Sequence, residues 1–215
     1  MCGRYTLTVT DLGEVVAMLD AMVEAEAAAL HRPRYNIAPT DVALLARPGD
    51  ERPRIVPAVW GLRRGQRLII NVRSESAATR FPAAYQRGRG VVPADGFYEW
   101  TGEPRDRRPL WFHAADGAPL LMAGLFDERE GDLPAFAVLT TAARPPVAGI
   151  HDRMPVLLTR EGARRWLLGP PSGVVLPDDV PLSARPVSPR VNSTAHDDPA
   201  CLEPPDEAGR QLGLF

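Results

Sequence analysis

The sequence predicts a single α+β domain that is rich in β-strands. Its 215 residues favour one large domain over two small ones. Short apolar runs recur at regular spacing and are cut by glycines and by 23 prolines, which is typical of strands joined by long loops. Helical patterns are few, so we expect a small number of helices to flank the sheets.

The first element is predicted to be one long amphipathic helix that ends before Pro33. Asp11 and Glu14 fit a capping arrangement, because the second acid lies three residues after the first. The apolar residues then fall on one face at helical spacing: Leu12, Val15, Val16, Leu19, Met22 and Val23. The alanine- and glutamate-rich stretch 24–29 continues the pattern, and the apolar face is expected to pack into the core.

Strands are predicted wherever a short apolar run is bounded by turn residues. The runs are 42–46, 55–60, 68–73, 91–100, 109–114, 119–126, 134–140, 154–159 and 183–188. A second helix is predicted at 160–168 and a short one at 76–86. From about residue 195 the chain is polar and proline-rich, so we expect one domain over 1–205 and a C-terminal tail over 206–215.

Composition excludes several classes of protein. The chain is 45% hydrophobic and 24% charged, near the average of globular proteins, which argues against a disordered or fibrous chain. No apolar run reaches about 18 residues, so no transmembrane helix is expected. The first residues lack the pattern of a secretory signal, and the expected compartment is the cytoplasm. Two cysteines, Cys2 and Cys201, make no disulfide framework, and the sequence has no metal-ligand spacing. We therefore expect neither a metal nor a cofactor.

Positive charge is concentrated in the middle of the chain. All 25 basic residues are arginine, and no lysine is present. Residues 52–108 carry 12 arginines and 5 acids, a net charge of +7, whereas the chain as a whole has a net charge of −2. This distribution fits a surface for a polyanion, or equally a solvated face with local ion pairs.

Cys2 could carry chemistry if Met1 is removed. A terminal cysteine is a 1,2-aminothiol, whose amine and thiol are both partly deprotonated near neutral pH. Its amine can form an imine with an aldehyde, and its thiol can then close a thiazolidine ring. The thiol alone could also act in acyl transfer. The alternative is an incidental cysteine at a frayed end.

Three further residues stand out by their surroundings. Asn71 ends an apolar run, and its amide could orient a neighbour or simply form a turn. Glu99 lies between aromatic residues, where burial would raise its pKa and suit it to proton transfer, unless it forms a salt bridge at a strand edge. His151 lies beside an acid and a base before an apolar run, so it is a candidate acid or base, or a structural histidine.

Six segments in a fixed order resemble one known family, the SOS-response-associated peptidase (SRAP) family of abasic-site-shielding proteins. The segments are Met1–Tyr5, Arg34–Pro39, Trp60–Leu62, Asn71–Glu75, Val92–Trp100 and Ile150–Pro155. The resemblance extends from residue 2 to about residue 205. It implies an irregular β-barrel-like core with a groove for single-stranded DNA, in a bacterial protein associated with the nucleoid.

The resemblance also implies an activity. Met1 is removed autocatalytically, and the freed Cys2 forms a covalent thiazolidine link with the ring-opened abasic sugar, which protects the lesion during the DNA damage response. A lyase side reaction through the imine is plausible for the same chemistry. The expected partner is single-stranded DNA with abasic sites, without a membrane or metal, and the expected oligomeric state is a monomer.

The family's roles extend to individual positions of this chain. Cys2 matches the nucleophile, Asn71 the amide that positions it, and Glu99 and His151 the acid–base groups. The positions matching DNA-contacting residues are Arg4, Pro39, Arg73, Arg80, Trp100 and Arg153. Thr140 is a further, weaker candidate.

This chain departs from the family pattern after Trp60–Leu62. Where relatives carry a loop with proline and tryptophan, this chain reads Arg63-Arg64-Gly65-Gln66-Arg67. We therefore expect DNA contacts with more electrostatic and less stacking character, and a strong dependence of affinity on salt.

Two alternatives are kept beside the crosslinking hypothesis. One is a thiol peptidase that acts on other proteins through Cys2, Glu99 and His151. The other is a non-covalent module that binds single-stranded DNA through the basic middle of the chain and leaves those three residues without a role.

Overall fold

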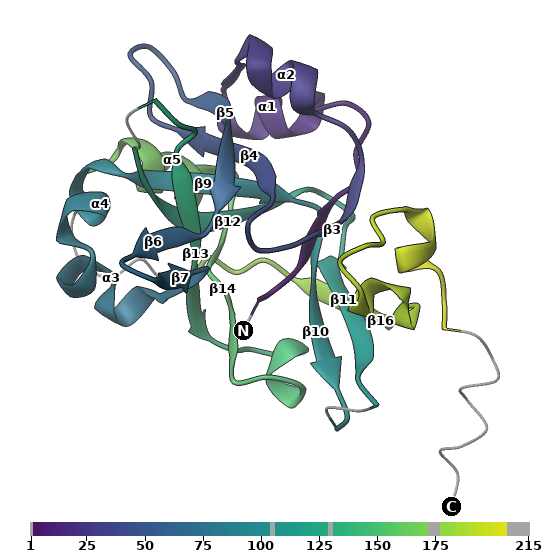
Figure 1. The fold of residues 1–215 in the computed structure, drawn as a ribbon. Coiled ribbons are helices and arrows are strands. Elements are labelled where there is room, and N and C mark those ends of the chain that lie inside the picture. The colour runs from purple at the N-terminus through teal and green to yellow at the C-terminus, as the bar shows by residue number, and fades with distance from the viewer. Residues whose placement is uncertain (1, 104–105, 129–130, 172–176, 206–215) are drawn as a thin grey trace, which may run out of the picture.

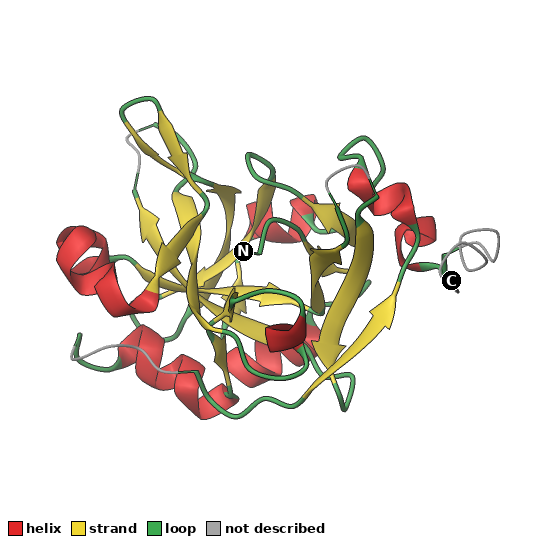
Figure 2. Cartoon of the chain, turned by 90° about the horizontal axis from the view of Figure 1, so that it is seen from below, coloured by secondary structure: helices red, strands yellow, loops and turns green. Residues whose placement is uncertain are grey.

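The computed structural model describes residues 2–103, 106–128, 131–171 and 177–205. Two sheets and a separate hairpin form its framework, with the helices around them (Figures 1 and 2). The predicted tail at 206–215 lies outside the described residues. No helix of the described part is long and apolar enough to cross a membrane.

The larger sheet closes on itself irregularly. Its strands follow in space as β14 (Arg153–Pro155), β13 (Ala135–Ala142), β12 (Leu120–Asp127), β9 (Arg89–Ala94), β4 (Val42–Arg47), β5 (Arg54–Trp60) and β2 (Met22–Val23). Two short strands join it, β15 (Leu157–Leu158) beside β12 and β8 (Asn71–Arg73) beside β13. Because β13 also pairs in parallel with β5, the path returns on itself and gives a barrel-like core rather than a clean barrel.

The smaller sheet carries the start of the chain. Its order is β16 (Leu182–Pro186), β11 (Arg108–Ala114), β10 (Gly96–Thr101), β1 (Tyr5–Leu7) and β3 (Arg34–Ile37). A separate hairpin consists of β6 (Leu62–Arg64) and β7 (Arg67–Ile69). The N-terminal end lies between the two groups of strands in the view of Figure 2.

Five α-helices and three 3₁₀ segments are present in the described residues. The α-helices are α1 (Gly13–Leu19), α2 (Ala25–Leu30), α3 (Ser74–Arg80), α4 (Pro82–Arg87) and α5 (Arg160–Leu168). The 3₁₀ segments are η1 (Val147–Gly149), η2 (Pro189–Asn192) and η3 (Pro199–Leu202). The β-rich α+β fold predicted from the sequence is thus confirmed, as is the helix at 160–168.

The long helix predicted between residues 12 and 29 is wrong. The chain instead forms α1 and α2, separated by β2, which pairs in parallel with β5. Asp20 ends α1 in the left-handed conformation, with φ of 49°. Its backbone thereby turns the chain toward the sheet, where tertiary pairing overrides the local helical pattern.

Three of the predicted strands are each divided between two strands, and one of them is 154–159, which becomes β14 and β15. The run 91–100 becomes β9 in the larger sheet and β10 in the smaller one, and the chain changes sheet at Asp95. A Cβ at Gly96 would lie 2.1 Å from the Trp111 indole nitrogen, so only glycine fits there. Likewise, 68–73 becomes β7 and β8, and the short helix at 76–86 becomes α3 and α4, because Pro82 begins a new helix.

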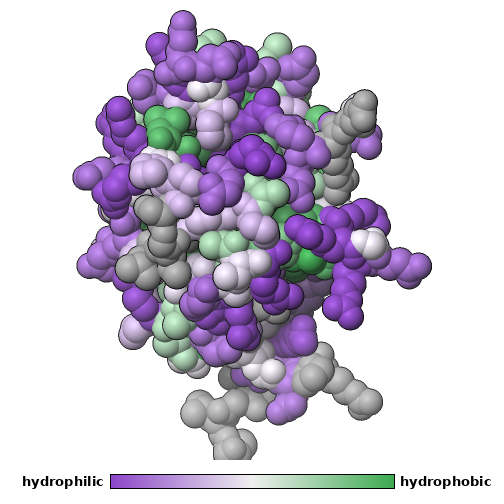
Figure 3. Space-filling view, turned by 90° about the vertical axis from the view of Figure 1, so that its left-hand side faces the viewer, coloured by the Kyte–Doolittle hydropathy of each residue, from purple (hydrophilic) through white to green (hydrophobic). Residues whose placement is uncertain are grey.

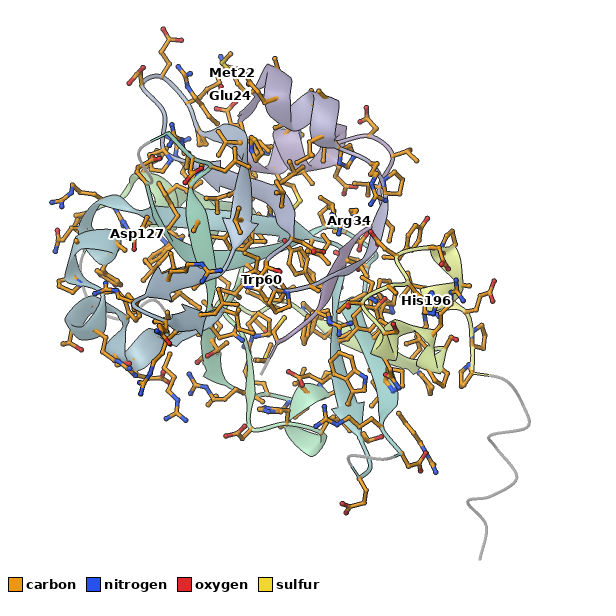
Figure 4. The ribbon with its side chains drawn as sticks, viewed as in Figure 1. Met22, Glu24, Arg34, Trp60, Asp127 and His196 are labelled. Atoms are coloured by element: carbon orange, nitrogen blue, oxygen red, sulfur yellow. The ribbon has the colours of Figure 1, made fainter. Side chains whose placement is uncertain are left out.

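Aromatic side chains hold the two sheets together. Trp60 of β5 is fully buried, with its ring 5.1 Å from that of Tyr5 on β1 and 6.4 Å from that of Phe136 on β13. Its indole nitrogen donates to the carbonyl of Ile70 at 3.0 Å. Figure 4 shows Trp60 near the middle of the molecule. This packing fixes the strand that follows Cys2 against the barrel-like core.

The C-terminal described segment is tied to β3. Asn36, which is buried, donates through its amide to the carbonyls of Val191, Ser193 and His196. Asp197 accepts from the backbone N–H groups of Tyr35 and Asn36 and pairs with Arg34. Figure 4 shows Arg34 and His196 on these neighbouring segments.

Candidate functional site

Cys2 is held at the start of the smaller sheet. Its side chain is fully buried, and its thiol lies 3.7 Å from the carbonyl of Arg4, which accepts its weak hydrogen bond. The amide of Asn71 donates to the Cys2 carbonyl at 2.7 Å. The predicted pairing of Cys2 with Asn71 is thus present as a direct contact between two segments 69 residues apart.

Strand pairing explains why Asn71 reaches Cys2. Asn71 begins β8, which lies parallel to β13 with Asn71 opposite Val138 and Arg73 opposite Thr140. The intervening Val72 is buried, and alternation along the strand directs Asn71 and Arg73 to the other face. Asn71 therefore faces the Cys2 end, and exposed Arg73 follows it on the same side.

Glu99 brings a carboxyl group into the same region. It lies on β10, the neighbour of β1, and only 4% of it is exposed. Burial raises the pKa of Glu99 above its usual range, while the charge of His151 partly opposes that shift. A carboxyl group tuned upward in this way can give and take a proton closer to neutral pH.

The Cys2 thiol is also perturbed by its surroundings. Burial raises the pKa of the thiol strongly, and the negative charge of Glu99 raises it further. The thiol is thus held in its protonated form, and a nearby base must remove its proton before it can act as a nucleophile. Cys2, Asn71 and Glu99 are therefore assembled at one place, as the sequence predicts.

His151 stands on the segment between η1 and β14. About a third of its side chain, 31%, is exposed. Its Nδ1 lies 2.9 Å from the backbone nitrogen of Arg153, which donates to it, and 2.9 Å from a carboxylate oxygen of Asp152. The charge of His151 opposes the rise in the pKa of Glu99, so the two side chains interact electrostatically.

Two of the arginines expected to contact DNA are engaged within the protein. The guanidinium of Arg4 donates to the side-chain oxygen of Asn36 at 2.8 Å and to the carbonyl of Val191 at 2.9 Å. The guanidinium of Arg153 forms a two-pronged ion pair with Glu75 at 2.7 and 2.8 Å, and one prong also donates to the carbonyl of Thr140 at 2.6 Å. Arg153 is 9% exposed, so this contact is largely shielded from water.

The other candidate DNA-contacting residues lie closer to the surface. Arg73 and Arg80 are exposed, and within the described residues their guanidinium groups have no ion pair or hydrogen bond. Trp100 is half-buried and donates from its indole nitrogen to Asn192 at 2.7 Å. Pro39 is half-buried in the turn between β3 and β4, where Thr40 has a φ of 77°.

Glu75 and Asp152 were missed as site residues in the sequence. Glu75 holds Arg153, whose guanidinium lowers the pKa of the Glu75 carboxyl to about 2. Both acids lie inside the segments that carry the family resemblance: Asp152 lies directly between His151 and Arg153, and Glu75 lies two residues after Arg73. Sequence position alone could have drawn attention to them, but not to the groups they contact.

Several buried polar atoms around the site have no hydrogen-bond partner in the described part of the chain. They are Asn71 Oδ1, Thr140 Oγ1 and Arg153 Nε. Such atoms are costly in a folded protein and mark places where a ligand or water completes the network. Thr140 is fully buried and lies opposite Arg73, so its hydroxyl belongs to the same strand pair as Asn71.

No metal site is found among the described residues, which hold no group of three or more histidine, cysteine, aspartate and glutamate side chains that could bind a metal ion. One hollow of about 350 Å³ lies between α1 and α5, lined by Met18, Arg52, Arg164 and Leu168 among others. None of the predicted site residues lines it.

Comparison with known proteins identifies the family of the chain. A family model described as SOS response associated peptidase (SRAP) matches residues 1–194. The abasic site processing protein YedK of Escherichia coli K12 is 35% identical over 177 residues, which cover 78% of this chain and 79% of YedK. The abasic site processing protein YoqW of Bacillus subtilis 168 is 30% identical over 183 residues, with 78% and 80% covered.

Relatives extend to vertebrates and to solved structures. The abasic site processing protein HMCES of Xenopus tropicalis is 29% identical over 224 residues, covering 80% of this chain and 66% of HMCES. A phage-related protein of Bordetella bronchiseptica has a solved structure that is similar with a TM-score of 0.68 at 30% identity, covering 86% of this chain and 94% of that one. A second Bordetella bronchiseptica structure has a TM-score of 0.71 at 25% identity, covering 87% and 100%.

Proposed function

The chain belongs to the SOS response associated peptidase (SRAP) family, and from that premise we propose that it processes abasic sites by forming a covalent link between Cys2 and the lesion in single-stranded DNA. Its relatives are named as abasic site processing proteins, which supports abasic sites as the substrate class. One observation carries the proposal. The amide of Asn71 donates a hydrogen bond to the Cys2 carbonyl, and the carboxyl of Glu99 is buried in the same region.

The reaction begins with the removal of Met1, which frees the α-amine of Cys2. That amine attacks the aldehyde carbon of the ring-opened abasic sugar, and loss of one water molecule gives an imine. The Cys2 sulfur then adds to the imine carbon, while the sulfur's proton passes to the imine nitrogen. The product is a thiazolidine ring, and its mass equals that of protein plus DNA minus one water.

Each assembled side chain has a role in these steps. Asn71 fixes the Cys2 backbone. The nucleophile therefore loses less conformational entropy when it reaches the geometry in which it attacks the aldehyde. Glu99, whose pKa is raised by burial, accepts and returns the protons that move as the imine forms and the ring closes. His151 serves as a second acid–base group toward the sugar. Thr140 and Asn71 offer buried polar atoms for the incoming sugar.

Single-stranded DNA is proposed to approach across the face that carries α3 and the β6–β7 hairpin. Arg73 and Arg80 are exposed there, together with Arg63, Arg64 and Arg67 of the hairpin. This region lies in the part of the sequence with a net charge of +7. Figure 3 shows that the face on the side of α3 and α4 is largely hydrophilic. Arginine forks suit phosphate, and such contacts are independent of base sequence.

Two accessory activities follow from the same chemistry. Removal of Met1 is a peptidase step that needs one turnover and uses the same cysteine. A lyase reaction follows from the imine, because an imine acidifies the neighbouring carbon and favours elimination of the phosphate. Borohydride reduction tests the second activity, since failure to trap an imine would remove its intermediate.

Intact-mass spectrometry tests the proposed function directly. The protein is measured before and after mixing with an oligonucleotide that carries one abasic site. We expect loss of Met1 and then an adduct equal to protein plus DNA minus water. Cys2→Ala should abolish the adduct yet leave binding of an intact oligonucleotide unchanged.

The matched control is Cys201→Ala. Cys201 is also buried, but it lies in η3 with its thiol near the carbonyl of His196, apart from the Asn71 contact. This variant should form the adduct as the unmodified protein does. An adduct that survives Cys2→Ala, or that vanishes in Cys201→Ala, would contradict the proposed nucleophile.

A further inference from the structure

The imidazole of His151 has two different neighbours at the same ring nitrogen. The backbone N–H of Arg153 donates to Nδ1 at 2.9 Å. A carboxylate oxygen of Asp152 lies 2.9 Å from the same atom. A single ring nitrogen either carries a proton or offers a lone pair, so it cannot satisfy both neighbours at once.

The two neighbours favour opposite tautomers of the neutral ring. When Nδ1 accepts from Arg153, the proton of the neutral ring is on Nε2, which can then only donate. When Nδ1 carries the proton and donates to Asp152, Nε2 holds the lone pair and acts as a base. The choice of neighbour therefore decides the chemistry at Nε2.

Asp152 is the charged one of the two neighbours. A hydrogen bond from the ring N–H to its carboxylate is charge-assisted, and such bonds are roughly twice as strong as neutral ones, although water weakens this pair because 79% of the Asp152 side chain is exposed. When the ring is protonated on both nitrogens, the same carboxylate pairs with the positive charge. The base and acid forms of His151 thus share one contact, and the ring need not move between them.

The Arg153 N–H is held in place by a separate contact. The Arg153 side chain is fixed between Glu75 and the Thr140 carbonyl, and Glu75 lies two residues after the end of β8, the strand that carries Asn71. These contacts thereby fix the Arg153 N–H relative to β8, whose Asn71 is hydrogen-bonded to Cys2. Glu99, on β10 of the smaller sheet, also interacts electrostatically with His151.

We propose that Asp152 is a positioning residue that selects the Nδ1–H tautomer of His151, and that without Asp152 the Arg153 N–H holds the ring in the opposite, Nε2–H tautomer. In the working cycle Nε2 takes a proton from a reacting group and gives the cation. It then returns that proton and leaves Nδ1–H bonded to Asp152. The catalytic part of this inference rests on the proposed function, whereas the tautomer does not.

Nitrogen-15 NMR of the histidine rings tests the tautomer in the protein without DNA. Long-range correlations distinguish a protonated from an unprotonated ring nitrogen. We expect the neutral His151 ring to be Nδ1–H in the unmodified protein and Nε2–H in Asp152→Ala. His31, His113 and His196 serve as internal references whose signals should not change tautomer.

The matched control is Asp50→Ala, which removes another exposed acid, here one that lies 3.7 Å from Arg54. It should leave the His151 tautomer unchanged. An Nε2–H ring in the unmodified protein, or an unchanged tautomer in Asp152→Ala, would overturn the proposal.

The rate of crosslinking tests the positioning role. At saturating abasic oligonucleotide, Asp152→Ala should slow single-turnover crosslinking by about tenfold to a hundredfold, up to the lower end of the range of direct acid–base effects, because Asp152 acts through His151. The Kd for an intact oligonucleotide should change less than about twofold. A changed tautomer with an unchanged rate would overturn the positioning role. If the unmodified protein forms no adduct, the proposed function fails, while the NMR result still decides the tautomer.

Discussion

The half-buried Arg4 and the buried Arg153 differ from the exposed Arg73 and Arg80 in what their guanidinium groups contact. Arg4 and Arg153 each donate to two acceptors within the protein. Arg73 and Arg80 are exposed and have no such acceptor within the described residues. Four arginines that a motif places in one class thus fall into two physical groups.

This difference teaches that a motif position does not reveal whether a guanidinium is available for phosphate. Arg153 is already paired with the carboxylate of Glu75, and Arg4 donates to two neutral oxygens, so DNA must compete with those acceptors. An exposed arginine exchanges only water and counterions for phosphate. That all four contact DNA remains a prediction, and the first group is expected to contribute more to stability than to affinity.

The largest expected effect is a difference in the free energy of unfolding between variants of Arg153 and of Arg73. Arg153→Gln removes the two-pronged pair with Glu75 and the bond to the Thr140 carbonyl, so it should lower the free energy of unfolding by about 2 kcal/mol. Arg73→Gln should change it by less than about 0.5 kcal/mol. Urea unfolding at pH 7 measures both. Equal, small losses would show that the Arg153 pair does not stabilise the fold.

The next effect concerns Glu75, the partner of Arg153, and its contribution to the free energy of unfolding at low pH. The pKa of Glu75 falls from its ordinary 4.5 to about 2, first because of its bond with Arg153. Because the folded-state pKa is depressed, the stabilisation is present above about pH 4.5 and disappears as the pH falls toward 2. Half of the Glu75 side chain, 52%, is exposed, so the effect is about 1 kcal/mol at most.

Glu75→Gln isolates this contribution. Its unfolding free energy should lie below that of the unmodified protein at pH 7, and the two curves should converge between about pH 5 and pH 2. A difference that stays constant over that range would show that the Glu75 charge is not the source. Glu161→Gln is a suitable control, since Glu161 forms an exposed pair with Arg165 on α5.

The contribution of the exposed arginines to DNA binding should appear in the salt dependence of the affinity. Each phosphate contact contributes about 0.7 to the slope of log affinity against log salt for a single strand. Arg73→Ala and Arg80→Ala should each lower that slope by about this amount and weaken binding about fivefold near 0.1 M salt. Fluorescence anisotropy with an intact oligonucleotide gives the slopes. If Arg153→Gln lowers the slope equally, the division into two groups of arginines is wrong.

Much of the fold could be predicted because strand patterns are local. The runs at 42–46, 55–60 and 109–114 each lie within one observed strand, because the apolar pattern of a buried strand is contained in its own residues. The break at Asp20 could not be predicted, because it depends on the pairing of β2 with β5, some 30 residues further on. The division at Asp95 depends likewise on Thr6 and Thr8, whose groups donate to its carboxylate.

The candidate site shows the same limit. Cys2, Asn71, Glu99 and His151 could be predicted from segments that resemble a family, and the structure brings Cys2, Asn71 and Glu99 together. The contact between Glu75 and Arg153 joins residues 78 positions apart, and no local pattern encodes it. The role of Asp152 depends on which atom of His151 it meets, which only the folded segment determines.

The smallest expected effect is that of Trp100→Phe, because Trp100 combines a polar contact within the protein with an aromatic face in one side chain. Its indole nitrogen donates to Asn192, while its ring lies half-buried with its centroid 6.2 Å from that of Tyr98. Trp100→Phe removes the polar contact and keeps an aromatic face, so DNA affinity should change less than about twofold. Trp100→Leu removes the face as well and should weaken binding about tenfold, because stacking on a base is worth about 1–3 kcal/mol. Equal losses in both variants would assign the role of Trp100 to its bond with Asn192 and not to its ring. In that case the aromatic part of the DNA surface would have to be sought elsewhere.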